Sequence, residues 1–367
     1  MLGFRQNAVL LVRAGSVAVF ACCLFGCTGC KEGEGVNTVC ESEASRTSVA
    51  AAFRAEAIVR VGSALQAAEA LSRALDAHAA APSERTLVDA RDRHLVARRA
   101  LVAAGPYLYG PLGGDDATEQ LETFPADTTL VSGFLRGDAG YDPASPPTSD
   151  RGFAAIEFAL FRHADTLSLA SAGAEYLRRQ GELAVAQLTT LDTDWREAEA
   201  FSIDEGTSAG SAFSVVVNSV SRQLEDARRE RLGEPFGIAT LEIPVPQAVE
   251  APYSRQSTEL LLESISASRR ALTAESAPSA RGLLAYLEEH RNPEARALAT
   301  DIEAAYAELV DAVLAIPGPI AQAVIDERAA VQRAYAAFSR QVINLKTDLP
   351  AVTCVAITYV DNPSDSD

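Results

Sequence analysis

Apolar side chains recur every three or four residues along most of the chain after residue 45, and this spacing predicts helices. Val61, Leu65 and Leu71, for example, share one face of a helix expected at 45–79. Pro82 breaks that pattern, and Ser83 is a suitable N-cap for the next helix. The predicted helices span residues 45–79, 84–104, 164–200, 209–231, 255–273, 279–289, 293–316 and 319–346, with a short helix after Asp150.

The stretches between these helices predict how the chain is divided. Residues 110–150 are rich in Gly, Pro, Asp and Thr and are expected to be irregular. Residues 236–254 look extended and Pro-punctuated, which indicates a crossing between two halves. Arg328 interrupts the apolar seam of the last helix, and the tail after residue 350 is expected to give a short strand and then a polar end. The fold class is therefore all-α, with helical-bundle halves at 45–235 and 236–367.

Composition supports helix and excludes one class of partner. The 367 residues are rich in Ala, Leu, Arg and Glu, and only 6% are aromatic. These side chains lose little conformational freedom on a helix. The formal net charge is −18, and an acidic surface repels a phosphate backbone, so no nucleic-acid partner is expected.

The N-terminal segment predicts a lipid anchor. Residues 14–26 are apolar or small and follow two arginines, but the run is too short to span a membrane, so residues 1–26 are interpreted as a signal peptide. The sequence Leu24-Phe25-Gly26-Cys27 looks like the lipobox of bacterial lipoproteins, with Cys27 as the acylated residue and residues 27–44 as a tether. Cys30 is the alternative, but Cys27 occupies the position where its lipobox would need an aliphatic residue. The expected location is the bacterial cell envelope, periplasm-facing or at the surface.

Cysteine placement predicts one disulfide bond. An exported protein meets an oxidising compartment. Cys40 and Cys354 flank the folded region, and chain termini often lie close together, so we expect a bond between them. No pair of Cys-x-x-Cys motifs with zinc spacing is present in the sequence.

Five segments in order resemble the imelysin-like family. The segment from Gly152 to Phe161 is similar to the family signature, a Gly-x-His-x-x-Glu followed by an aromatic and aliphatic run. The other four are Ala97-Arg98-Arg99-Ala100 to Tyr107-Leu108-Tyr109-Gly110-Pro111, Arg229-Glu230-Arg231-Leu232-Gly233-Glu234-Pro235-Phe236-Gly237, Glu250-Ala251-Pro252-Tyr253-Ser254, and the ending from Ile357 to Asp367. The resemblance implies two pseudo-symmetric helical bundles, a polar site near their junction, residence in the bacterial envelope and a link to iron acquisition. It also carries a peptidase label.

The chain departs from the family pattern at the presumed metal ligands. A His and a Glu at i, i+3 lie on one helix face and can reach one ion, but Ala154 stands where the family has the His. Gly105 occupies the place of a family acidic residue. Glu157 alone does not make a site for iron or another divalent metal, which usually needs three or four ligands. His78, His94, His163 and His290 are scattered, although His94 lies on the helix that leads to Tyr107 and could approach the site in space.

The remaining candidate binding residues each have two interpretations. Glu157 either binds a cation or a ligand amine between the bundles, or is a structural carboxylate that caps a backbone or pairs with Arg162 or Arg255. Tyr107 and Tyr109 either line a pocket or plug the end of the bundle. Ser254 is expected to be an N-cap, and Trp195 is expected to anchor a helix interface.

Three functions are compatible with these features. The first is a non-enzymatic, lipid-anchored envelope protein linked to iron or other metal uptake or to ligand binding, with a degenerate metal site. The second is a metal-dependent peptidase, which needs a bound metal and a water-activating base. The third is a scaffold whose cleft binds an envelope protein partner, for which a large apolar patch at the cleft would be expected.

Overall fold

The computed structural model describes residues 42, 44–111, 121–138, 151–162, 171–206, 208–276 and 281–357. All of these residues belong to one compact unit, Asn37–Asp367. The predictions for the signal peptide, Cys27, Cys30, Cys40 and His163 concern residues outside the described ones. The division into halves at residue 235 stays a prediction, as does their pseudo-symmetry.

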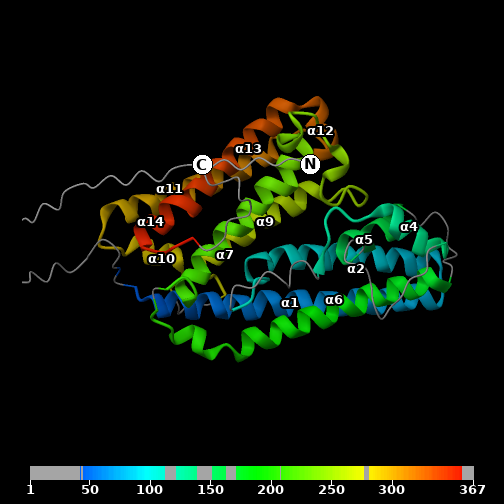
Figure 1. Cartoon of the computed structure of the whole chain (residues 1–367), viewed down its shortest axis with the longest axis horizontal. Coiled ribbons are helices and arrows are strands. Elements are labelled where there is room, and N and C mark those ends of the chain that lie inside the picture. The colour runs from blue at the N-terminus through cyan, green and yellow to red at the C-terminus, as the bar shows by residue number, and fades with distance from the viewer. Residues whose placement is uncertain are drawn as a thin grey trace, which may run out of the picture. The chain divides into compact units, whose positions relative to one another are not determined.

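A first group of helices packs around the longest one. Helix α1 (Arg46–Ala80) contacts α2 (Glu84–Ala103) and α6 (Ser171–Glu197), which run alongside it, with α4 (Thr128–Arg136) and α5 (Phe153–Glu157) packed on α6 and α2, respectively (Figure 1). The Ser45 side chain caps α1 by accepting a hydrogen bond from the Ser48 N–H at 3.1 Å. Ser83 and Thr86 form a reciprocal capping box at the start of α2, which confirms Ser83 as an N-cap.

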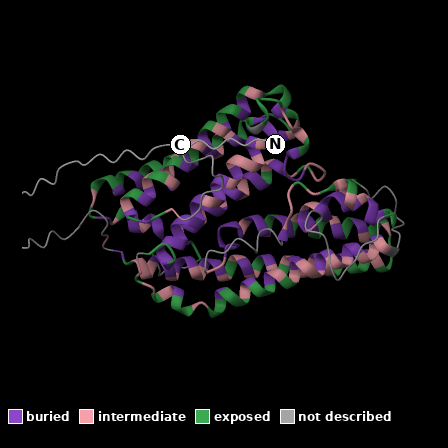
Figure 2. Ribbon diagram, in the orientation of Figure 1, coloured by how far each residue is buried: buried purple, intermediate pink, exposed green. Residues whose placement is uncertain are grey.

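A second group follows, and α7 (Ala212–Asp226) joins it to the first. Helix α7 contacts α1, α9 (Ser257–Thr273) and α13 (Arg328–Ile343), and it is buried along most of its length (Figure 2). The remaining helices are α8 (Glu234–Phe236), α10 (Leu283–Glu288), α11 (Pro293–Leu314), α12 (Ile320–Asp326) and α14 (Leu349–Thr353). Asn292 caps α11, whose first residue is Pro293.

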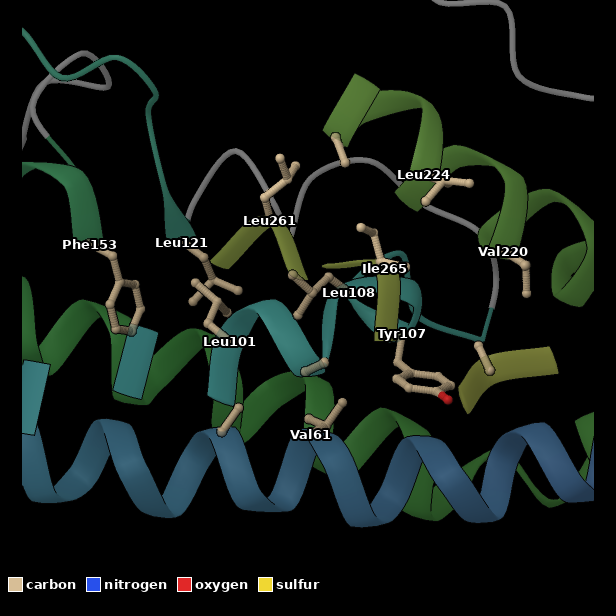
Figure 3. Packing of buried hydrophobic residues seen from close by; sticks show 14 of the residues in the cluster. Val61, Leu101, Tyr107, Leu108, Leu121, Phe153, Val220, Leu224, Leu261 and Ile265 are labelled. Carbon is tan, nitrogen blue, oxygen red and sulfur yellow. The ribbon is translucent and has the colours of Figure 1, made fainter. Parts of the chain in front are cut away.

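The hydrophobic core continues from the first group of helices into the second. Val61 of α1, Leu101 of α2 and Ile265 of α9 belong to one buried cluster, together with Val220 and Leu224 of α7 (Figure 3). All five side chains are at most 3% exposed. Because the core is shared, a residue at the junction of the two groups is held by both.

The prediction of an all-α fold is confirmed. In the described part of the chain, β pairing is limited to two isolated bridges, Ser42 with His290 and Glu122 with Gly152. Among these residues no helix has both the length and the apolar character that crossing a membrane requires.

Several local predictions were wrong. Helix α4 lies inside the segment expected to be irregular, because Asp127 caps it and Val131, Phe134 and Leu135 bury its apolar face. The stretch expected to be extended forms short turns of 3-10 helix at 238–240 and 246–248. The start of the tail is helix α14, while residues 358–367 lie outside the described part, so the strand expected in the tail stays a prediction.

The single helix predicted at 319–346 is divided in two. Helix α12 ends at Asp326, and α13 begins after Glu327, whose φ of −119° and ψ of 37° are not helical. Arg328 turns away from the core seam, donates to the Phe236 carbonyl at 3.3 Å and lies over the Phe236 ring at 4.4 Å. The break therefore allows the arginine that interrupts the apolar pattern to reach a partner on α8.

Candidate functional site

The signature segment begins at a glycine that the fold requires. Gly152 precedes α5 with a φ of +80°, and a Cβ atom there would lie 1.8 Å from the Leu121 carbonyl oxygen. The Gly152 N–H donates to the Gln180 side chain of α6 at 2.9 Å. These contacts fix the start of α5 and therefore the direction in which Glu157, its last residue, points.

Glu157 supports the turn that precedes α9. Its Oε1 accepts hydrogen bonds from the backbone N–H groups of Tyr253, at 3.0 Å, and Ser254, at 2.7 Å. The side chain is 3% exposed. Burial raises the pKa of Glu157, although the hydrogen bonds to Ser254 and the charge of Arg98 act in the opposite direction. The arrangement is that of a structural carboxylate capping a backbone, one of the two interpretations of this residue.

The arginines and the serine expected to act beside Glu157 have other roles in the structure. Among the described residues, neither Arg162 nor Arg255 forms an ion pair with it, and Arg255 is exposed with a φ of +59°. The N-cap prediction for Ser254 was wrong, because α9 begins at Ser257 and the residue in the cap position is Gln256. Ser254 contributes its backbone N–H to Glu157 instead.

Four charged side chains form a second polar group, in which Arg98 and Glu250 are buried and Glu122 and Arg231 are partly exposed. This ionic cluster consists of Arg98, Glu122, Arg231 and Glu250. Arg98 pairs with Glu122 through Nη1 and with Glu250 through Nη2, the latter at 2.5 Å. Arg231, on the π-helical segment 227–233, reaches the same Oε1 of Glu250 at 2.5 Å. Burial alone would raise the pKa of Glu250, but the adjacent Arg231 and Arg98 outweigh it and hold the pKa below its usual range.

A small polar cavity of about 80 Å³ adjoins the ionic cluster. We call it the ionic cavity; its polar lining residues are Arg98, Tyr109, Glu122, Gln223, Asp226, Glu230 and Arg231. The volume suits a few water molecules or a small ion. Sequence reasoning missed this cluster as a site, although Arg98, Arg231 and Glu250 all lie in the segments that carry the family resemblance.

The two candidate tyrosines lie in different environments. Tyr107 is 1% exposed and packs against Phe53 and Trp195, with ring centroids 4.8 and 6.5 Å away. Its carbonyl accepts a hydrogen bond from the Trp195 indole at 2.9 Å, so Trp195 joins α6 to this turn. Tyr109 lines the ionic cavity and donates its hydroxyl to Asp226 at 2.9 Å. Tyr109 therefore lines a cavity, as one interpretation expected, whereas Tyr107 packs within the aromatic core.

His94 approaches the signature segment but does not face Glu157 as a ligand. Its Nε2 lies 3.0 Å from the Phe153 carbonyl oxygen, to which it donates when the ring is neutral. Burial lowers the pKa of His94 to about 4, which keeps the ring neutral. The histidine therefore holds the backbone of α5.

The residues around Glu157 do not fit a metal ion. Ala154 has no donor atom, and Oε1 of Glu157 already accepts two hydrogen bonds. Nε2 of His94 is used by Phe153, and its Nδ1, which has no hydrogen-bond partner among the described residues, would supply at most one further ligand. A Cβ atom at Gly105 would lie 2.3 Å from the Gln223 amide oxygen, so an acidic side chain there would displace Gln223. Within the part of the chain that the structure describes, no three His, Cys, Asp or Glu side chains are grouped as metal ligands.

Cys354 is disulfide-bonded, and its partner lies outside the described residues. The pairing with Cys40 stays a prediction. Near this end of the chain, Arg46 donates to the Thr353 carbonyl at 2.9 Å, which holds α14 against the start of α1.

Comparison with known proteins supplies the family. Residues 59–345 match the sequence profile of the imelysin family. The fold is similar to a crystal structure provisionally named as an iron-regulated protein A precursor from Parabacteroides distasonis, at 20% identity over 84% of this chain and 94% of that one, with a TM-score of 0.70. An imelysin-like protein from Psychrobacter arcticum is also similar, at 18% identity over 87% of this chain and 99% of that one, with a TM-score of 0.67. No curated protein gives a significant match. Since the profile covers well over half of the sequence, the chain belongs to the imelysin family.

Proposed function

We propose that this protein is a non-enzymatic, lipid-anchored envelope member of the imelysin family, linked to iron or other metal uptake or to ligand binding, in which the signature metal site is degenerate. The observation that carries the proposal is the position of Glu157, whose Oε1 is occupied by the backbone of Tyr253 and Ser254. In this chain the signature carboxylate supports the turn before α9 in place of holding an ion.

Physical chemistry favours this role. A carboxylate that coordinates a metal offers its oxygen lone pairs to the ion, and a first-row metal normally collects three or four such protein ligands. Here Ala154 supplies none, and one oxygen of Glu157 already accepts two N–H groups. The link to iron rests on family membership and on the name of the Parabacteroides relative.

The rival functions receive less support. A metal-dependent peptidase needs a bound catalytic metal and a base that activates water, and the residues around Glu157 do not fit such a metal. A scaffold that binds a protein through the family cleft would need a large apolar surface there. The cavity beside the ionic cluster, at about 80 Å³, is too small for a protein segment, and five of its lining residues are charged, so it does not offer such a surface.

The metal test compares the full-length chain with Glu157→Ala. Elemental analysis of the purified proteins and calorimetric titration with iron, zinc and copper are measured on both. The proposal expects no stoichiometric site that depends on Glu157. Stoichiometric binding that disappears in the variant would mean that substitute ligands have preserved the site, and would refute the proposal.

The lipid anchor has a separate test. We expect mass spectrometry of the mature N-terminus to find acyl chains on Cys27, and Cys27→Ser to release the protein from the membrane fraction. Cys30→Ser is the matched control and should leave membrane attachment unchanged. Loss of attachment in the Cys30 variant alone would transfer the anchor to that residue.

A further inference from the structure

A large cavity bounded by described residues lies away from the signature segment. It has a volume of about 910 Å³ and forms where the end of α6, the 3-10 segment Glu199–Ile203, the turn at 108–111 and the start of α7 meet. We call it the α6–α7 pocket. Its size lies in the range of pockets that hold small organic molecules.

The floor of the α6–α7 pocket is apolar and buried. Leu108, Leu191 and Phe201 line it and are each at most 7% exposed. Phe201 stacks edge-on against Trp195, with ring centroids 5.4 Å apart. Ile203 also lines the pocket but is 76% exposed, so it forms part of the open rim. A ligand in this pocket would therefore bury an apolar body against a preformed surface.

Every charged residue that lines the pocket is acidic. They are Asp194, Glu197 and Asp204, and the lining contains no Lys, Arg or His. Asp204 already accepts from the N–H groups of Gly206 and Ala212, both at 2.7 Å. Asp194 and Glu197 are exposed and have no ion-pair partner among the described residues.

Three arginines lie around the pocket without lining it, and one of them, Arg222, lies over the ring of Tyr109 at 4.3 Å. Arg196 pairs with Asp192 at 2.7 Å. Arg54 donates to the Trp195 carbonyl at 2.9 Å and to the Arg196 carbonyl, behind the last turn of α6. Because the lining itself carries three carboxylates and no cation, it favours a negative potential at the mouth of the pocket.

The α6–α7 pocket is separate from the ionic cavity, although Leu108 and Tyr109 line both. The Tyr109 hydroxyl donates a hydrogen bond to Asp226, which lines the ionic cavity and not the α6–α7 pocket. A ligand site in the α6–α7 pocket would be a function beyond the proposed one, and it does not depend on whether Glu157 holds a metal ion.

We propose that the α6–α7 pocket binds a small, largely apolar organic cation. The apolar floor selects an aromatic or aliphatic body, and the carboxylates at the rim select a positive charge on one end of it. An anionic molecule of the same shape would be disfavoured by the same carboxylates. Exposed ion pairs are individually weak and are screened by salt, so the preference for a cation is strongest at low ionic strength.

The test uses three fluorescent probes that share one apolar body. Pyrenemethylamine is cationic, pyrenemethanol is neutral and pyrenecarboxylate is anionic at neutral pH. Each is titrated into the full-length chain held in lipid nanodiscs, with empty nanodiscs subtracted. We expect saturable one-to-one binding in which the amine binds several-fold more tightly than the alcohol, and the carboxylate binds most weakly.

Two variants and two matched controls locate the site. Asp194→Asn combined with Glu197→Gln should weaken binding of the amine by about 2- to 30-fold and leave the alcohol unchanged. Ile203→Lys places a cation at the rim and should weaken the amine in the same direction. Glu199→Gln, an exposed carboxylate that does not line the pocket, and Ile343→Lys, an exposed isoleucine on α13, should have no effect.

Three results would overturn the proposal. The first is the absence of saturable binding by any probe. The second is equal affinity for all three probes, which would leave only an unselective apolar surface. The third is a preference for the amine that persists in the Asp194 and Glu197 double variant. Because the rim residues are exposed, these variants should fold normally, and circular dichroism of each one checks this.

Discussion

Removing the Glu157 side chain tests whether this carboxylate is a structural support. Glu157→Ala deletes the acceptor of two backbone hydrogen bonds, of 3.0 and 2.7 Å, and leaves the N–H groups of Tyr253 and Ser254 without it. A net hydrogen bond contributes about 1–1.5 kcal/mol, and a vacated buried volume adds to the loss. We therefore expect the free energy of unfolding to fall by about 2–4 kcal/mol, which for a chain of this length lowers Tm by roughly 3–6 °C.

Glu157→Gln keeps a hydrogen-bond acceptor at this position and removes the negative charge. The amide keeps an oxygen that can accept both N–H groups, so we expect this variant to lie within about 1 kcal/mol of the wild type at neutral pH. Because burial raises the pKa of Glu157, the folded state binds its proton more tightly than the unfolded chain does. The contribution of this group to stability is therefore present below the unfolded pKa and is lost as pH rises through the folded pKa. The glutamine variant should lack that part of the pH dependence.

Thermal unfolding in metal-free buffer is the assay. Trp195 is the only tryptophan and is fully buried, so its emission reports the loss of the core, and circular dichroism reports the helices. Glu69→Ala, the same chemical change at an exposed position of α1, is the control and should change stability by less than about 0.5 kcal/mol. If the alanine variant melts with the wild type, the carboxylate does not support the turn. If the glutamine variant is as unstable as the alanine variant, the charge rather than the acceptor matters.

Three further variants examine the surroundings of the turn. Arg98→Met leaves the partly buried Glu122 without its ion-pair partner and the buried Glu250 with Arg231 alone. It should lower the free energy of unfolding by about 2–4 kcal/mol, whereas the exposed Arg99→Met should not, and equal effects of the two variants in urea unfolding would contradict a stabilising role for the ionic cluster. His94 has a folded-state pKa of about 4 against the usual 6.5, so the unfolded chain binds more protons between these values and stability rises with pH across that window, by up to about 1.4 kcal/mol per pH unit. The Tm of His94→Gln should rise less steeply there, and an unchanged slope would assign the effect to another group. Ala154→His restores the signature but should not create a sub-micromolar zinc site in calorimetry, and tight binding would mean that Glu157 can leave the turn.

The sequence predicted the helices well where the regular spacing of apolar residues continues over many turns. The seams of α1, α9 and α11 extend over many turns, so a period of three to four residues identifies them. Helix α4 was missed because it has nine residues and lies within a segment whose composition resembles a loop. The break after Asp326 was missed because buried apolar residues recur every three or four positions in both α12 and α13, so the sequence pattern looks continuous.

The candidate site was predicted only in part. The resemblance directed attention to Glu157 and Ser254, which the structure brings into contact. It gave no information on which atom of Ser254 takes part, because backbone N–H groups are present at every residue. The pairing of Arg98 with Glu250 joins residues 152 positions apart, and no local pattern reports a contact of that range.

The support that Glu157 gives to the turn before α9 affects what a match to the family signature means in this chain. A residue that holds the backbone can be retained for stability whether or not it binds a ligand, because replacing it lowers the free energy of unfolding. Ala154, which makes no such contact, is free of that constraint. The glutamate of the signature is therefore poor evidence for metal chemistry on its own, and the neighbouring position, where only function would demand a histidine, is the more informative one to inspect in related sequences.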